Sequence, residues 1–230
     1  REIVEFRRTQ DFYKSNSNNI SQNVVHNNRL DGIMMDGSDI NTIRANVVRD
    51  NLRAGIRIVN SSQNTVDQNN AERYTWGIYQ DNSSHAIMRR NFMVNNRYNF
   101  YSRGDNDIDA SNKVKAASMG QNSSVYYLVN DSDKSIEQSS NPGLVYCLNC
   151  TNITMKGLNL TNNVYGILLE NTTGSRIEGS RLTGNQMGIG LFACNDNNLS
   201  NNELLDNAQD GLLIFDSNNN VMERNNISKN

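Results

Sequence analysis

Aromatic and charged residues recur close to a set of evenly spaced glycines, and their side chains have the chemistry that binds sugars. In an extended chain, the second and fourth residues after a glycine lie on the same face. Sugar rings have apolar faces and polar rims, which suit aromatic rings beside charged groups. We therefore predict a carbohydrate-binding surface formed by Arg57, Trp76, Tyr79, Tyr98, Tyr101 and Arg103. Ordinary stacking of Tyr and Arg on a polar sheet face is an equal alternative.

Two aspartates at equivalent positions could support acid–base chemistry on the same face. Asp36 and Asp81 lie two repeats apart, about 9.6 Å by strand spacing, with Arg57 between them and Tyr79 nearby. Polysaccharide lyases, epimerases and glycosidases use paired carboxylates, with a cation beside a uronate. The sequence contains no adjacent Asp-Asp pair and no Gly-His-Gly. We favour a non-catalytic module and keep such an enzyme, acting through these four residues, as the alternative.

A transition-metal site would require His, Cys or Met side chains that converge. The two histidines, His26 and His85, lie in different repeats, and the adjacent Met34 and Met35 would face opposite sides of a strand. Copper binding is therefore the third and least favoured function. The three cysteines include a CxxC pair and cannot all pair within one chain. We interpret them as small core or turn residues: Cys147, Cys150 and Cys194.

Three alternating aspartates, Asp105, Asp107 and Asp109, have the spacing that opens a calcium-binding loop. Ala110 stands where an EF-hand has glycine, and Ala116 stands where it has glutamate. The segment is therefore not an EF-hand. A looser calcium site is one interpretation, and a solvated acidic turn is the other. We expect no other cofactor.

Asparagine dominates the composition and supplies many candidate glycosylation sites. The chain has 230 residues, of which 42 are Asn and one is Pro, with 36% hydrophobic residues and a net charge of −2. This charge excludes nucleic-acid binding through a basic surface, and no apolar run is long enough to span a membrane. In a secreted protein, N-x-Ser/Thr sequons can be glycosylated. They begin at Asn19, Asn60, Asn82, Asn122, Asn130, Asn149, Asn152, Asn159, Asn171, Asn198 and Asn226.

A repeat of 22 or 23 residues organises the chain and must position these side chains. A glycine followed by a large aliphatic residue recurs, and aliphatic residues follow at two further fixed offsets. The glycines are Gly32, Gly55, Gly77, Gly143, Gly166, Gly188 and Gly211. Three short runs of period-two alternation per repeat predict three short strands, and repeats too small to bury a face alone must stack on their neighbours.

The predicted fold is therefore an all-β, right-handed parallel β-helix of about ten turns. Asparagine at its corners tolerates the left-handed backbone region, and stacked Asn amides can form a ladder. We expect one domain over residues 1–230, with an irregular insertion at about 103–142. Because the chain begins at Arg1, we expect it to be a mature or excised piece of a longer protein.

Several segments resemble the β-helix repeats of NosD-like proteins, which are abundant on the surface of methanogenic archaea. Residues 41–46 with 55–58 have the repeat pattern, and residues 107–114, 125–130 and 145–154 resemble segments found inside those archaeal proteins. The resemblance covers nearly the whole chain, although residues 115–124 are longer and more polar than the link expected there. It implies a secreted or cell-surface β-helix, and copper binding belongs to the family's name.

The combined interpretation is an extracellular, cell-surface module with a structural or carbohydrate-binding role. Its expected partners are a polysaccharide or surface glycan, and flanking domains or neighbouring copies that meet the open solenoid ends. The second half also carries large apolar residues at positions expected to face outward. Either a partner covers them, or the inward and outward phases exchange there: Leu168, Phe192, Leu213 and Phe215.

Overall fold

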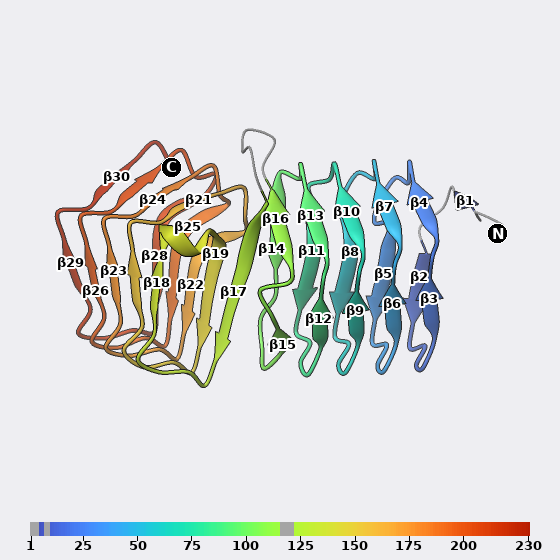
Figure 1. Cartoon of the computed structure of the whole chain (residues 1–230), viewed down its shortest axis with the longest axis horizontal. Coiled ribbons are helices and arrows are strands. Elements are labelled where there is room, and N and C mark those ends of the chain that lie inside the picture. The colour runs from blue at the N-terminus through green and yellow to red at the C-terminus, as the bar shows by residue number, and fades with distance from the viewer. Residues whose placement is uncertain (1–4, 7–9, 116–121) are drawn as a thin grey trace. The chain divides into compact units, whose positions relative to one another are not determined.

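The structure is a computed structural model that describes residues 5–6, 10–115 and 122–230. The chain forms two compact units, residues 1–122 and residues 123–230, which are described separately here as the N-terminal and C-terminal units. Both units are built from short parallel strands that coil turn upon turn (Figure 1). The predicted right-handed parallel β-helix with three strands per turn is confirmed.

The N-terminal unit has three parallel sheets, and each full turn contributes one strand to each. The first sheet contains β2 (Gln10–Tyr13), β5 (Ile33–Asp36), β8 (Ala54–Val59), β11 (Trp76–Asp81) and β14 (Tyr98–Tyr101). The second contains β3 (Asn19–Ser21), β6 (Thr42–Arg44), β9 (Thr65–Asp67), β12 (Ile87–Arg89) and β15 (Asp107–Ile108). The third contains β1 (Glu5–Phe6), β4 (Val24–His26), β7 (Val47–Arg49), β10 (Asn70–Glu72), β13 (Phe92–Val94) and β16 (Lys113–Lys115).

The C-terminal unit repeats this plan. Its first sheet contains β17 (Ser123–Val129), β19 (Pro142–Leu148), β22 (Tyr165–Glu170), β25 (Met187–Phe192) and β28 (Asp210–Phe215). The second contains β18 (Ser135–Glu137), β20 (Thr154–Lys156), β23 (Arg176–Glu178), β26 (Asn198–Ser200) and β29 (Val221–Glu223). The third contains β21 (Asn159–Thr161), β24 (Arg181–Thr183), β27 (Glu203–Leu205) and β30 (Asn226–Ser228).

The region predicted as an irregular insertion, residues 103–142, contains several regular elements. β15 to β18 lie in it, and a 3-10 helix at Gln138–Ser140 precedes β19. Residues 116–121 of the predicted insertion lie outside the described part of the chain.

Strand register stacks equivalent residues of successive repeats and so builds the core. Ile33 pairs with Ile56 and Ile56 with Ile78, and all three side chains are fully buried. The C-terminal unit has an equivalent column of Ile167 and Ile189. The 22- to 23-residue period therefore places one aliphatic residue above another in each turn, which buries the apolar faces that a single repeat would expose.

Buried asparagines form amide ladders at the corners, as the sequence predicted. In the N-terminal unit, Asn46 Oδ1 accepts hydrogen bonds from Asn23, Asn69 Oδ1 from Asn46, and Asn91 Oδ1 from Asn69, at 3.0 Å. Each bond joins one turn to the next. Polar side chains at these corners thus satisfy backbone N–H groups that the bends of the chain remove from the strand ladders.

Val145 and Cys147 are core residues, although they stand two and four residues after Gly143, at the offsets that face outward in other repeats. Val145 pairs with Ile167 and Cys147 with Leu169, so both side chains belong to the core. Counting from Gly143 misaligns this strand by one residue because Leu144, and not Gly143, occupies the position of Gly166 in the register. A glycine motif therefore predicts the register only when the strand begins at the same distance from the glycine in both repeats.

Of the four apolar residues expected on the outer face of the C-terminal unit, only Phe215 is largely exposed, at 65%. Leu168 is buried, and Phe192 and Leu213 are half-buried. A row of aromatic rings runs along this face with centroids 6.1 to 6.4 Å apart, and it explains the burial of Leu168, whose register neighbour Tyr146 belongs to the row. The row consists of Tyr127, Tyr146, Tyr165, Phe192 and Phe215.

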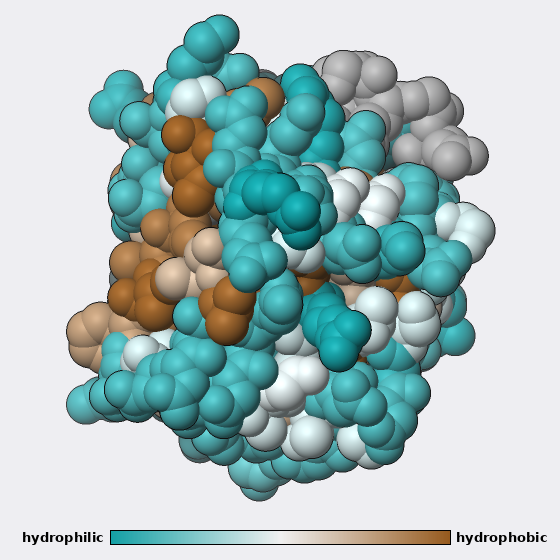
Figure 2. Space-filling model, turned by 90° about the vertical axis from the view of Figure 1, so that its left-hand side faces the viewer, coloured by the Kyte–Doolittle hydropathy of each residue, from teal (hydrophilic) through white to brown (hydrophobic). Residues whose placement is uncertain are grey.

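The last turn of the C-terminal unit exposes an apolar patch (Figure 2). Its exposed residues are Phe215, Val221, Met222 and Ile227. The partners predicted for the open ends of the solenoid stay a prediction.

Candidate functional site

Two neighbouring strands of the N-terminal unit, β8 and β11, and the residue that precedes β8 position four side chains around a hollow of about 200 Å³ on the outer face of the first sheet. The hollow is lined by Arg53, Arg57, Trp76 and Tyr79. Tyr79 pairs with Arg57 in the strand register, which places the phenol ring beside the guanidinium. The rings of Trp76 and Tyr79 lie 5.6 Å apart and are tilted by 57°. The structure therefore brings together three of the six residues predicted to bind carbohydrate.

The remaining predicted aromatic residues lie beside this site on the adjacent strand β14. The rings of Tyr79 and Tyr101 stack at 4.9 Å, but Tyr101 is only 8% exposed. Tyr98, which pairs with Trp76, is 5% exposed. Tyr98 and Tyr101 thus hold the exposed rings in place and offer little ring surface to a ligand. Arg103 follows β14 and is half-buried.

Arg53 was missed by the sequence analysis, and a buried carboxylate fixes its position. Arg53 Nε donates to both oxygens of Asp31 at 2.9 and 3.1 Å, and its Nη2 also contacts Asp31. Asp31 is fully buried and also accepts a hydrogen bond from the backbone N–H of Ala54 at 3.1 Å. The hydrogen bond from Asp31 raises the pKa of Arg53 above its usual value. An opposite charge one repeat away was the only sequence signal for this pair.

Arg57 has a different environment because it forms no ion pair within the described residues. Its Nη1 lies 3.9 Å from Met34 Sδ, and the Tyr13 hydroxyl donates to the same sulfur at 3.7 Å. Burial and the charge of Asp81 raise the pKa of Tyr79, whereas Arg57 lowers it. The Arg57 guanidinium is therefore close enough to the phenol to act on its charge, and it remains available to a ligand.

The structure does not form the predicted acid–base arrangement of Asp36, Arg57 and Asp81. Asp36 pairs with Val59 and Val59 with Asp81, so Val59 occupies the middle position. Arg57 precedes Val59 by two residues on the same strand. Asp36 Oδ1 accepts a hydrogen bond from Asn60 Nδ2 at 2.9 Å, and Asp81 Oδ1 accepts one from the backbone N–H of Asn82 at 3.1 Å. At the ends of these strands, Asp36, Asn60 and Asn82 form a row of hydrogen-bonded polar side chains, which we call the outer ladder.

Two of the three aspartates considered for calcium, Asp107 and Asp109, pair with Arg89. Arg89 Nη2 pairs with Asp107, and Arg89 Nε lies 3.2 Å from Asp109. The carbonyl of Asp105 accepts a hydrogen bond from the backbone N–H of His85 at 2.6 Å. Within residues 10–115 and 122–230, no three His, Cys, Asp or Glu side chains gather as a metal site would require. Calcium binding at these residues stays a prediction.

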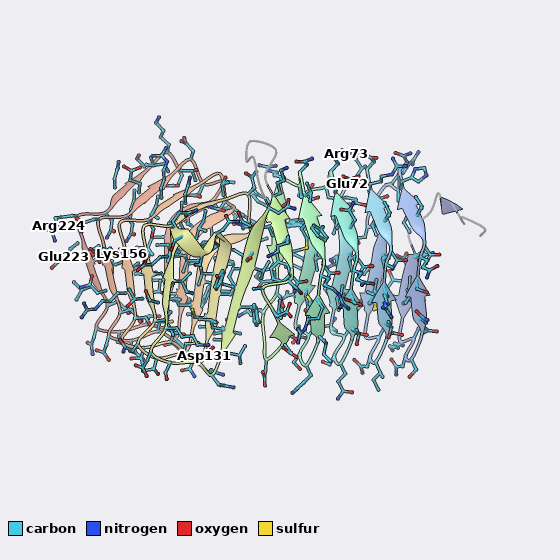
Figure 3. All side chains as sticks on the ribbon, viewed as in Figure 1. Glu72, Arg73, Asp131, Lys156, Glu223 and Arg224 are labelled. Atoms are coloured by element: carbon cyan, nitrogen blue, oxygen red, sulfur yellow. The ribbon has the colours of Figure 1, made fainter. Side chains whose placement is uncertain are left out.

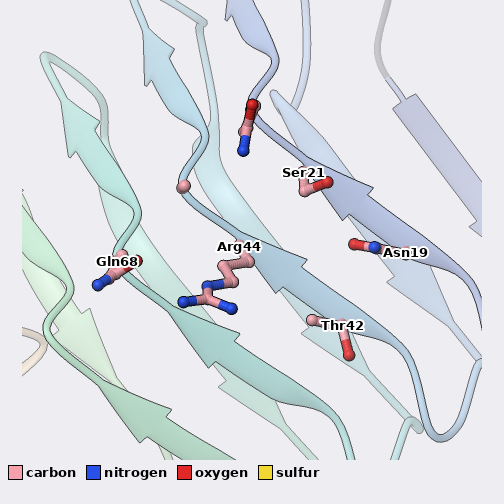
Figure 4. Close-up of a pocket in the computed structure, with 7 residues that line it drawn as sticks. Asn19, Ser21, Thr42, Arg44 and Gln68 are labelled. Carbon is pink, nitrogen blue, oxygen red and sulfur yellow. The ribbon is translucent and has the colours of Figure 1, made fainter.

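A second hollow, of about 420 Å³, lies on the second sheet of the N-terminal unit (Figure 4). It carries no aromatic side chain. Arg44 projects into it and also pairs with Asp67 at 3.3 Å, while Arg90 holds Asp67 from the other side at 2.8 Å. Its lining residues are Asn19, Ser21, Gln22, Thr42, Arg44, Ala45 and Gln68. Because it offers no ring surface, this hollow is less suited to sugar stacking than the first.

Charged pairs elsewhere on the surface are mostly exposed and local. Arg73 lies 2.6 Å from Asp50 and 3.5 Å from Glu72, and Figure 3 shows Glu72 and Arg73 at one edge of the N-terminal unit. Exposed pairs of this kind contribute little to stability.

Ten of the eleven sequon asparagines are exposed, and Asn198 is half-buried. Several of them use their amide nitrogen internally, because Asn60 donates to Asp36 and Asn82 to Asn60, and Asn171 donates to Asn149. Since a glycan is attached through this nitrogen, modification at these positions would interrupt the outer ladder. Glycosylation stays a prediction.

The fold and the site define the protein as a parallel β-helix with an aromatic and charged hollow on its outer face. The sequence profile of the NosD family, described as periplasmic copper-binding protein, matches residues 5–118 and 108–230. The chain therefore belongs to the NosD family. Comparison with curated proteins gives no match. Among the described residues, no helix has the length and apolarity needed to cross a membrane.

Solved structures with a similar coil of strands include epimerases and a phage protein. The periplasmic alginate epimerase AlgG has 14% identity and a TM-score of 0.40, with 95% of this chain and 47% of that one covered. For the A-module of the Azotobacter vinelandii mannuronan C-5 epimerase AlgE4, the values are 16%, 0.31, 89% and 52%. For tailspike protein 3 of bacteriophage CBA120 they are 11%, 0.26, 94% and 46%. The chain spans about half the length of each, and these likenesses carry no argument about activity.

The family description implies a copper ion, and copper binding by this chain stays a prediction. His26 lies on β4 and His85 at a corner after β11, where its Nδ1 is 3.0 Å from Ser84 Oγ. The softest candidate ligands are Cys147 and Cys150, whose thiols hydrogen-bond each other. This bond lowers the pKa of Cys150 to about 7 and raises that of Cys147. Both side chains are buried, and the Cys150 thiol also donates to the backbone carbonyl of Leu148 at 3.3 Å. This bond is local, two residues back along the chain.

Proposed function

We propose that the protein is a non-catalytic carbohydrate-binding module that works outside the cytoplasm, at the cell surface. The hollow lined by Arg53, Arg57, Trp76 and Tyr79 is the observation that carries this proposal. It combines two partly exposed rings with an unpaired guanidinium on a rigid sheet, the arrangement that suits a sugar with an apolar face and a polar rim. The exposed sequons and the periplasmic description of the family support a location beyond the inner membrane.

The carboxylates favour binding over catalysis. Asp36 is held by the Asn60 amide, and Val59 separates it from Asp81. Neither carboxylate has the opposed partner across a sugar that hydrolysis of a glycosidic bond requires. A lyase or epimerase would need a base close to the cation that binds the uronate. Asp36 and Asp81 instead lie level with Val59, two residues beyond Arg57 along the strand.

The affinity of such a site is modest for a single sugar. A pyranose face that covers ~60 Å² of apolar ring surface gains about 1.5 kcal/mol, which corresponds to about tenfold in affinity. Loss of the Trp76 ring should therefore weaken binding by about tenfold. Repeated contacts along a polymer would raise the overall avidity without any stronger single site.

Retention of the protein on a panel of neutral and uronic polysaccharides, with reducing ends and unsaturated products measured together, tests this proposal. We expect retention without product release, and Trp76→Ala should abolish most of it. Phe92→Ala is the matched control, because Phe92 is an exposed ring on β13 in the third sheet of the same unit. Release of products by the wild type would make the protein an enzyme. Equal retention of the Trp76→Ala variant and the wild type would contradict the assigned site.

A further inference from the structure

We infer that the carbohydrate is acidic, and that Arg57 binds the carboxylate of a uronic acid residue in it. The inference rests on the proposed sugar-binding function and names the class of sugar. It starts from a difference between the two arginines of the hollow. Arg53 is neutralised by the buried Asp31 through three contacts, whereas Arg57 forms no ion pair within the described residues, and its Nη1 lies 3.9 Å from the sulfur of Met34.

An arginine without a carboxylate partner beside two partly exposed rings has a specific use in recognition. The guanidinium is planar and presents paired N–H donors that match a carboxylate in a bidentate arrangement. A uronic acid carries its carboxylate on the ring, next to the apolar face that stacks on an aromatic side chain. In this hollow, Arg57 and Tyr79 are paired in the strand register, so one sugar residue can meet both groups at once.

The acidic side chains at the strand ends fit the remaining groups of such a sugar. Asp81 follows Tyr79 by two residues, about 6.6 Å along the strand, and lies on the same outer face. Asp36 occupies the equivalent place two strands away. Sugar hydroxyls are donors, and these carboxylates are acceptors only. The site therefore has one unpaired cation for the carboxylate and separate acceptors for hydroxyl groups.

The experiment compares matched ligands that differ only in the carboxyl group. Oligogalacturonate and oligomannuronate are titrated into the full chain by calorimetry, beside the same oligosaccharides whose carboxyl groups have been reduced to primary alcohols. We expect the acidic form of at least one of them to bind about tenfold more tightly than its reduced form. Arg57→Gln should remove this preference, so that the variant binds the acidic and the reduced form with equal affinity. Trp76→Ala should weaken both forms alike.

The outcomes separate this inference from the proposed function. Equal affinity of the wild type for acidic and reduced forms would overturn the inference and leave sugar binding in place. A preference for the acidic form that survives in Arg57→Gln would also overturn it, because another cationic side chain would then bind the carboxylate. Arg57→Lys, which keeps the charge but loses the paired donors, should retain only part of the preference. Failure of the wild type to bind any form, or any glycan of the panel, would overturn the proposed function itself.

Discussion

Replacing Asn69 with alanine should test whether the buried amide ladder holds successive turns together. The Asn69 side chain is fully buried and makes four hydrogen bonds. Its Oδ1 accepts from the backbone N–H and the Nδ2 of Asn46, both at 3.0 Å. Its Nδ2 donates to the Ile43 carbonyl at 2.9 Å and to Asn91 Oδ1 at 3.0 Å.

The magnitude depends on which partners keep another bond. Asn46 Nδ2 still reaches the Ile20 carbonyl at 2.8 Å, and Asn91 Oδ1 still accepts from the backbone N–H of Asn69 at 3.0 Å. The backbone N–H of Asn46 and the carbonyl of Ile43 each lose a buried partner. A buried polar group left unpaired costs about 1–3 kcal/mol. We therefore expect Asn69→Ala to lower the free energy of unfolding by about 3 kcal/mol.

Urea denaturation followed by circular dichroism would measure this loss, with Asn60→Ala as the matched control. Asn60 also links two neighbours through its amide, because its Nδ2 donates to Asp36 and its Oδ1 accepts from Asn82, but it is exposed to water. Its loss should cost less than about 1 kcal/mol because solvent replaces both bonds. A loss below about 1 kcal/mol for Asn69→Ala, or equal losses for the two variants, would refute the reasoning.

Gly55→Ala should lower the free energy of unfolding by about 2 kcal/mol through overpacking, because its Cβ would lie 2.7 Å from the Gly77 carbonyl oxygen. Gly179→Ala should lower the free energy of unfolding by only about 1 kcal/mol, because its φ of 58° strains an alanine but nothing lies within 4 Å of the added Cβ. Urea denaturation that ranks the two variants in the opposite order would contradict this reasoning. Arg73 lowers the pKa of Asp50 below 3.8, so this pair stabilises the fold above pH 3.8 and loses its effect as the pH falls through the folded-state pKa. The stabilities of the wild type and Asp50→Asn should therefore converge as the pH falls from 3.8 through the folded-state pKa of Asp50, and a difference that stays constant over this range in acid titrations of stability would disprove the linkage.

Sequence periodicity was sufficient to predict the coil because the same small set of residue types returns in every turn. The aliphatic residues at Ile33, Ile56 and Ile78 stack in register, and asparagines such as Asn46 and Asn69 stack at the corners. A side chain repeated once per turn meets its own counterpart in the next turn wherever the strands begin at equivalent residues, so the period predicts which residues become neighbours there. The predicted placement of Arg57 beside Tyr79 followed from the same rule and is confirmed.

The exposed residues of the candidate site could not be predicted from the sequence of one repeat, because exposure depends on how neighbouring turns pack. Burial of Tyr98 and Tyr101, against partial exposure of Trp76 and Tyr79, depends on what packs over each ring. The register of Val145 depends on where its strand begins, which a glycine motif alone does not specify.

By itself, then, the sequence determined the parallel β-helix, its asparagine ladders and the columns in which repeated residues such as Ile33, Ile56 and Ile78 stack, because these follow from the period and from residue chemistry. Only the tertiary structure decided that Asp31 neutralises Arg53 and that Arg57 stays unpaired within the described residues. The physical reason is that ion pairing and exposure depend on side-chain direction and on packing between turns, and these are properties of the folded chain as a whole.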